Sequence, residues 1–166
     1  MAVEFKPKTI YVIYIAATSE KVWQALTSSE FTRKYFWERA IEVEPKRGGA
    51  FKLRLPDGSV NVYGEVLEYD PPHRLSVSWQ VARPEEFRKL PACRVTYDIA
   101  PAGDAVRLTM TESHSWEVPD AILSGGRMGW PAILSALKSL LETGKVPAIK
   151  MEPPKEMIEA IRNLKT

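Results

Sequence analysis

The sequence predicts an α+β fold in which one curved antiparallel sheet packs on a single long helix. Two observations predict this class. Between Thr9 and His114, short segments alternate apolar and polar side chains, which is typical of half-buried strands. Further on, the stretch Gly129–Gly144 repeats Trp, Ile and Leu at helical spacing and so presents one broad apolar face. Such a helix needs a large apolar partner surface, which the strands supply.

Length and composition indicate one domain over residues 1–166. Of the 166 residues, 45% are hydrophobic and 27% are charged, which is ordinary for a globular chain with a sizeable core. The formal net charge of +2 gives no electrostatic footprint for nucleic acid. No apolar run reaches the roughly 20 residues that span a bilayer, and Met1–Lys8 lacks an apolar signal region. We therefore expect neither a nucleic-acid partner nor a membrane partner.

Cysteine and histidine usage points to a reducing compartment and away from metal chemistry. Cys93 is the single cysteine, so an intrachain disulfide is excluded and a cytoplasmic location is favoured. The two histidines, His73 and His114, show no metal-ligand spacing with each other or with Cys93. We expect a cytoplasmic protein that holds no metal and no cofactor.

The N-terminal part predicts one strand followed by two short helices. Thr9–Ile15 is a run of β-branched and aromatic residues, which favours a strand. Thr18 or Ser19 then offers an N-cap for a first helix. Glu30–Trp37 forms the second helix, with its aromatic residues on one side.

A series of about six strands follows, because alternating segments are separated by turn residues. In Gly49–Leu55, for example, Phe and Leu alternate with Lys and Arg. The charged segment Val81–Ala92 predicts a solvated loop or a single helical turn. The expected strands are Ile41–Glu44, Gly49–Leu55, Val60–Tyr69, Arg74–Gln80, Cys93–Ala100 and Val106–His114.

Glycine and proline mark both ends of the long helix. Pro131 is tolerated in a first turn or at a kink, and Gly144 is placed to close the helix. The cluster Ser124–Gly129 either loosens the front of the helix, and so gates a cavity, or lets the helix pass close to the sheet. In the extension 145–166, Lys155–Lys165 predicts a short amphipathic helix. This helix packs on its own domain, on a twin subunit or on a partner, because it is too short to be stable alone.

Five segments carry a resemblance to a known family: Ile15–Thr27, Gly48–Phe51, Gly64–Pro72, Arg74–Trp79 and Gly129–Trp130 with the helix that follows. Together with the order of the elements, they resemble the helix-grip fold of the START and Bet v 1-like (SRPBCC) superfamily. Within it, the chain is similar to the branch named after the C-terminal domain of the activator of Hsp90 ATPase. The resemblance covers roughly residues 9–144 and implies a sheet that grips the long helix around an apolar cavity. Members bind small hydrophobic ligands, sequester toxic compounds or act as co-chaperones.

The last predicted strand holds two polar candidates for a ligand site. With Leu108 and Met110 facing the core, the two-residue period places Glu112 and His114 on the same inward side. A carboxylate and an imidazole in this arrangement can orient a polar ligand group or act as an acid–base pair. Alternatively, the strand leaves the core near Glu112, and both side chains reach water at the rim of the sheet.

Aromatic and apolar residues supply the candidate cavity wall. Tryptophans near the ends of elements lie where cavity mouths form, whereas Trp79 at core spacing is expected mainly to pack. Met128 is an adaptable wall residue. Together with Glu112 and His114, the candidate ligand-binding residues are Trp37, Phe51, Leu53, Trp79, Met110, Trp116, Met128, Trp130 and Leu134.

These residues are compatible with three functions. The leading hypothesis is a non-catalytic domain that binds a small hydrophobic molecule between the sheet and the long helix. The second is a co-chaperone-like module that binds a protein partner such as Hsp90, or a homodimer. The third is a hydrolase-type or cyclase-type enzyme with His114 as its base. No catalytic residue is assigned, because Cys93 has no histidine close in sequence and no Gly-x-Ser-x-Gly motif occurs.

Overall fold

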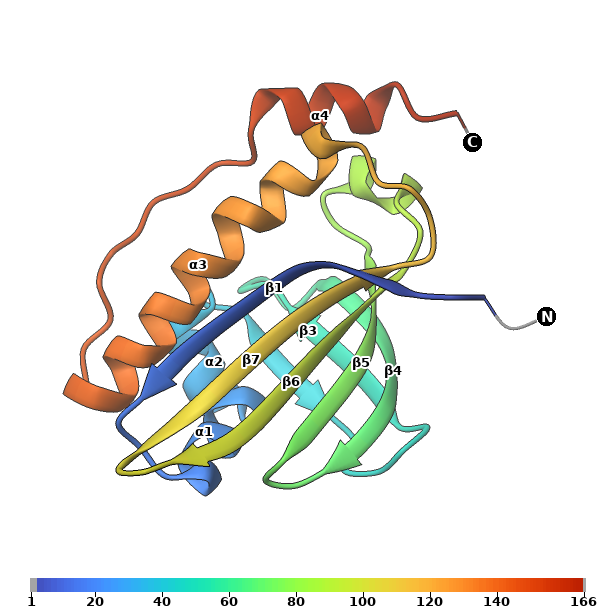
Figure 1. Cartoon of the computed structure of the whole chain (residues 1–166). Helices are drawn as coiled ribbons and strands as arrows, with labels where there is room; N and C mark the ends of the chain where they lie inside the picture. The colour runs from blue at the N-terminus through green and yellow to red at the C-terminus, as the bar shows by residue number, and fades with distance from the viewer. Residues whose placement is uncertain (1–2, 166) are drawn as a thin grey trace.

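The expected α+β class is confirmed. The computed structural model describes residues 3–165 and contains an open antiparallel sheet of seven strands with the long helix α3 packed on it (Figure 1). The strands are β1 (Lys6–Ile15), β2 (Ala40–Val43), β3 (Ala50–Arg54), β4 (Val60–Asp70), β5 (Arg74–Val81), β6 (Cys93–Ala102) and β7 (Ala105–His114). The helices are α1 (Ser19–Thr27), α2 (Ser29–Tyr35), α3 (Asp120–Thr143) and α4 (Lys155–Arg162), with a 3₁₀ turn η1 (Glu85–Lys89).

The strand order is β1-β7-β6-β5-β4-β3-β2. Strand β7 therefore lies between β1 and β6, and its register sets Glu112 opposite Thr9 on one side and Val95 on the other. Leu108 and Met110 are fully buried, so the alternation predicted for this strand holds as far as Met110, and the last four residues are all partly buried. The Glu112 carboxylate accepts a hydrogen bond from Trp130 of α3. The inward face of β7 thus delivers Glu112 toward α3.

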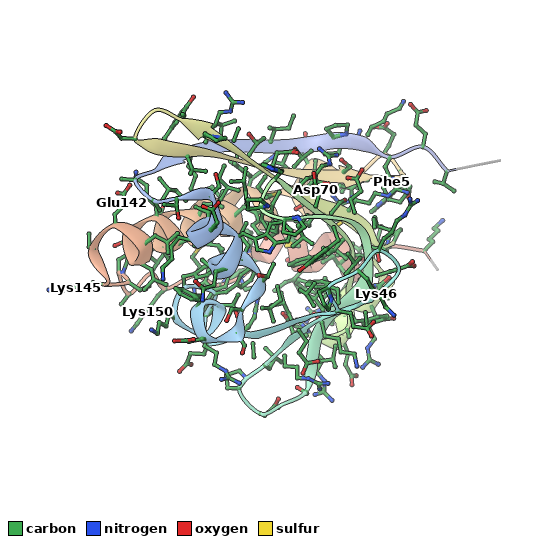
Figure 2. All side chains as sticks on the ribbon, turned by 90° about the horizontal axis from the view of Figure 1, so that it is seen from below. Phe5, Lys46, Asp70, Glu142, Lys145 and Lys150 are labelled. Carbon is green, nitrogen blue, oxygen red and sulfur yellow. The ribbon has the colours of Figure 1, made fainter. Side chains whose placement is uncertain are left out.

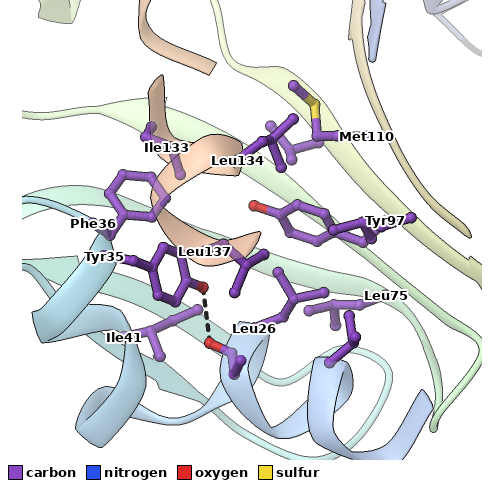
Figure 3. Packing of buried hydrophobic residues seen from close by; sticks show 14 of the residues in the cluster. Leu26, Tyr35, Phe36, Ile41, Leu75, Tyr97, Met110, Ile133, Leu134 and Leu137 are labelled. Carbon is purple, nitrogen blue, oxygen red and sulfur yellow. Dashed lines mark hydrogen bonds between the residues drawn. The ribbon is translucent and has the colours of Figure 1, made fainter. Parts of the chain in front are cut away.

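Local hydrogen bonds explain the two short helices. The Thr18 hydroxyl accepts a bond of 3.1 Å from the Lys21 amide, which confirms the predicted N-cap. The Tyr35 hydroxyl donates to the Ala25 carbonyl at 2.8 Å, so the end of α2 is tied to α1 (Figure 3). The second bond holds the end of α2, from which the chain leads into Trp37.

Helix α3 begins earlier than Gly129, where the apolar repeat starts. It starts at Asp120, includes the glycine cluster and carries Pro131 in its interior. Glycine is a poor helix former, so its presence here depends on tertiary packing rather than on propensity. At the other end Gly144 adopts φ 77° and its amide donates to Leu140, which confirms the predicted helix stop.

The main core lies between α3, the two short helices and the concave face of the sheet (Figure 3). Leu134 and Leu137 of α3 are buried there with Phe51, Leu53 and Met110. Charged side chains such as those of Lys46, Lys145 and Lys150 lie at the periphery of the molecule, as Figure 2 shows. Close packing fills this part of the interior with side chains.

A second, smaller cluster joins the C-terminal extension to the domain. Helix α4 crosses the N-terminal part of α3, after the chain has run back along α3 (Figure 1). Its Met157 and Ile161 are buried with Ile122 of α3 and pack on Phe87 of η1. The segment expected to be a solvated loop or a helical turn is therefore a 3₁₀ turn whose apolar residue is packed. Among residues 3–165, no helix combines the length and apolarity needed to cross a membrane.

Candidate functional site

A pocket of about 1040 Å³ lies where the ends of β5, β6 and β7 face the N-terminal half of α3. The turn η1 and the segment 149–154 complete its wall. Sites for small ligands usually have volumes of about 300–1000 Å³, so this pocket has room for one organic molecule. Its aromatic and polar lining residues include Phe36, Trp37, Arg39, Trp79, Phe87, Glu112, His114, Trp116 and Trp130.

Three aromatic rings form the inner wall of the pocket. Trp79 and Trp130 lie 5.5 Å apart between ring centroids, and Phe36 stands edge-on to Trp130 at 6.0 Å. Behind them Trp79 stacks on Phe51, which is part of the core. The rings therefore separate the filled core from the pocket and offer flat apolar surfaces to an occupant.

Glu112 links strand β7 to helix α3 by hydrogen bonds. Its Oε2 accepts a bond of 2.8 Å from the Trp130 indole, and its Oε1 lies 2.7 Å from Nε2 of His114. An ionised carboxylate can only accept, so Nε2 of His114 carries the proton of this bond. In the neutral imidazole, Nδ1 is then left as an acceptor, and it can receive a hydrogen bond or a proton from a ligand.

Two glycines of α3 face the site, and Gly126 leaves room for the Glu112 carboxylate. A Cβ on Gly126 would lie 3.3 Å from Oε2 of Glu112, and a Cβ on Gly129 would lie 3.8 Å from the Trp37 ring. Gly125 faces α4 instead, where a Cβ would collide with Met157. The predicted role of the cluster in close packing is therefore supported, with α4 and β7 as the neighbours.

Three polar groups in the pocket lack internal partners. Nε of Arg39, Nδ1 of His114 and Nε1 of Trp116 are buried without a hydrogen-bond partner among the described residues. Buried polar groups are normally satisfied, so unpaired groups on a pocket wall point to ligand or solvent contacts. Burial also lowers the pKa of the Arg39 guanidinium.

Cys93 lines the pocket but is unsuited to nucleophilic chemistry. Burial, with a smaller contribution from the negative charge of Glu112, raises the pKa of its thiol far above the usual range. The reactive thiolate is therefore scarce at neutral pH. Within the described part of the chain, no group of three or more His, Cys, Asp or Glu side chains gathers as metal ligands would.

The structure divides the sequence-derived candidates into two groups. Four of the predicted lining residues pack in the core instead of lining the pocket. Alternation shows which face of a strand points inward, but it does not show how deeply each inward residue is buried. The four residues are Phe51, Leu53, Met110 and Leu134. Met128 is 50% exposed and is not part of the pocket wall.

The residues brought together around the pocket are Trp37, Trp79, Glu112, His114, Trp116 and Trp130. The rim alternative for Glu112 and His114 is not observed, since their side chains are only 13% and 11% exposed.

Sequence reasoning missed Arg39 and the C-terminal contribution. Arg39 follows the short helix α2 and had no periodic signal, because its place depends on the turn before it. The segment 149–154 and Met157 line the pocket. The amphipathic pattern of the last helix was the one signal that this extension packs on the domain.

A curved antiparallel sheet around a long helix, with a pocket at one end of their interface, defines a helix-grip domain of the START and Bet v 1-like superfamily. Residues 16–142 match the family model described as activator of Hsp90 ATPase homolog 1-like protein. The chain belongs to this family. No curated protein matches the sequence significantly.

Solved structures with the same fold come from several bacteria. Protein MLL2253 from Mesorhizobium loti is 28% identical with a TM-score of 0.63, over 80% of this chain and 96% of that one. The Aha1 dimer from Colwellia psychrerythraea is 21% identical with a TM-score of 0.65, over 82% and 96%. CalU16 from Micromonospora echinospora is 21% identical with a TM-score of 0.66, over 98% and 92%. The last two likenesses concern the fold alone.

Proposed function

We propose that this chain binds a small, largely apolar molecule in the pocket between α3 and the ends of β5 to β7. The observation that carries the proposal is the inner wall of this pocket, where Trp79, Trp130 and Phe36 line one side of about 1040 Å³ of space. The unpaired groups of His114 and Trp116 supply the few polar contacts that orient a ligand in such sites. Catalysis is not needed to explain this arrangement.

A ligand that binds the folded state should raise the melting temperature. At a ligand concentration about 100 times Kd, the gain of about 2.7 kcal/mol corresponds to roughly 5–10 °C for a chain of this size. We expect at least one member of a panel of apolar aromatic compounds to give this shift and to change tryptophan fluorescence. Thermal melts and fluorescence titrations measure both effects.

A variant that blocks the pocket tests whether the ligand binds there. Gly129→Leu directs a large side chain toward Trp37 and should remove the shift. Ser135→Leu is the matched control, because it adds the same side chain at an exposed position of the same helix. A flat response of the unmodified chain across the panel, or an equal shift in Gly129→Leu, would contradict the proposal.

The family assignment favours a second candidate, a module that binds Hsp90. It rests on the match of residues 16–142 to the Hsp90-activator homolog model. If this function is correct, the purified chain should bind Hsp90 in a pull-down and stimulate its ATPase activity. Binding without stimulation would support a docking role alone, and the absence of both would exclude the candidate.

A further inference from the structure

Arg39 is a cation without an anion. No carboxylate of the described residues forms an ion pair with its guanidinium, and among these residues Arg39 is the only arginine that lines the pocket. Its Nε is buried and has no acceptor. The residue as a whole is only partly buried, and the burial of a charge costs free energy unless the charge is paired. The pocket thus contains a positive group for which the chain supplies no counter-ion.

The chain holds Arg39 in place by packing and by an unusual turn. The guanidinium lies 5.6 Å from the centre of the Trp37 ring and 5.9 Å from that of Phe36. Just before it, Trp37 and Glu38 adopt φ angles of 47° and 61°. Such left-handed conformations cost non-glycine residues roughly 1–2 kcal/mol each. Backbone strain of this kind tends to occur at functional sites.

Arg39 and Glu112 lie at different positions along the pocket. Gly129 of α3 faces Trp37, the ring under Arg39, whereas Gly126 faces Glu112. Three residues of helix separate these points by about 4.5 Å along the axis. Both oxygens of Glu112 already have partners in Trp130 and His114. A negative group on a ligand can therefore meet Arg39 without displacing the Glu112 network.

The remaining charges near the pocket do not replace the missing anion. Lys150 and Glu152 belong to the exposed segment 149–154, at the outer wall. Trp37 donates to the Ile149 carbonyl at 3.4 Å, so this segment is held against the same ring that carries Arg39. The guanidinium thus remains the one unpaired charge on the inner wall among residues 3–165.

We propose that the pocket selects an amphipathic ligand that carries an oxyanion, such as a carboxylate or a sulfonate, and that Arg39 is its counter-ion. The apolar body of the ligand lies against Trp79 and Trp130. Farther along the ligand, a hydroxyl group donates to Nδ1 of His114, or a carbonyl group accepts from Nε1 of Trp116. This inference rests on the proposed function and adds the chemical class of the ligand.

Two fluorescent probes with the same rings test the inference. Anilinonaphthalenesulfonate is anionic, and phenylnaphthylamine lacks the sulfonate. Arg39→Gln should lower the affinity for the anionic probe by about 10- to 100-fold, because a hydrogen bond to a charged group is lost. The affinity for the neutral probe should change by less than about twofold. Arg39→Lys should recover part of the loss, and Arg33→Gln, at an exposed position of α2, should change neither affinity.

The outcomes separate this inference from the function on which it rests. A loss of affinity for the anionic probe alone in Arg39→Gln, with an unchanged melting temperature, supports the inference. Equal weakening of both probes would assign Arg39 a structural role and overturn the inference. An unchanged affinity of the anionic probe would overturn it as well, while leaving ligand binding in place. If neither probe binds the unmodified chain, or if Gly129→Leu binds both normally, the proposed function fails.

Discussion

Replacing Gly64 with alanine should lower the free energy of unfolding by about 3 kcal/mol or more. A Cβ at this position would collide with the carbonyl oxygen of Ser78 and would lie 2.6 Å from its carbonyl carbon and from its Oγ. These atoms belong to the backbone and the short side chain of β5, the hydrogen-bonded neighbour of β4, so no flexible group can move aside. Urea denaturation followed by circular dichroism measures the loss.

The collision also disturbs the pocket. Ser78 precedes Trp79, and its hydroxyl accepts a bond of 2.8 Å from the Glu65 amide. Separation of the strands would therefore shift the Trp79 ring on the pocket wall, so we expect weaker binding as well as lower stability.

Gly129→Ala is the control for Gly64→Ala. Its Cβ would meet the Trp37 ring at an ordinary contact distance of 3.8 Å. In a helix, alanine is favoured over glycine by roughly 1 kcal/mol, so this variant should be as stable as the unmodified chain or more so. A loss of less than about 1 kcal/mol in Gly64→Ala would contradict the close approach of the two strands.

Glu112→Ala should also cause a large loss of stability and lower the free energy of unfolding by about 2–5 kcal/mol. The substitution removes the acceptor of both the Trp130 indole and Nε2 of His114, and it leaves these groups buried beside a new void. We expect a matching fall in ligand affinity, because Trp130 forms part of the pocket wall. Denaturation curves and the fluorescence titration give the two values.

Glu112→Gln distinguishes lost hydrogen bonds from lost charge. Its amide oxygen can still accept from Trp130, and its amide nitrogen can donate to Nε2 of His114, so the loss should stay below about 2 kcal/mol. The imidazole proton should then move from Nε2 to Nδ1. Nitrogen NMR of a chain with two histidines reports this change directly. Equal losses in the two variants, or a neutral His114 that is protonated at Nδ1 and not at Nε2 in the unmodified chain, would contradict the network.

Local sequence signals were sufficient for the order of the elements and for several of their ends. The two-residue period of β7 placed Glu112 and His114 on the inward face, because alternation follows from strand geometry alone. The N-cap at Thr18 and the stop at Gly144 depend on short-range hydrogen bonds and on backbone freedom, and both were predictable. The likeness to the Hsp90-activator branch likewise rested on local motifs in sequence order, and the family match confirms it.

Contacts between distant segments decided which inward residues fill the core and which face open space. Phe51 and Trp79 both looked inward from the pattern, yet Phe51 is buried in the core while Trp79 lies at the boundary with the pocket. The helical state of the glycine cluster, the docking of α4 and the place of Arg39 also depend on packing partners far away in sequence. Periodicity reports the direction of a side chain, but the depth of its burial depends on what the rest of the chain brings against it.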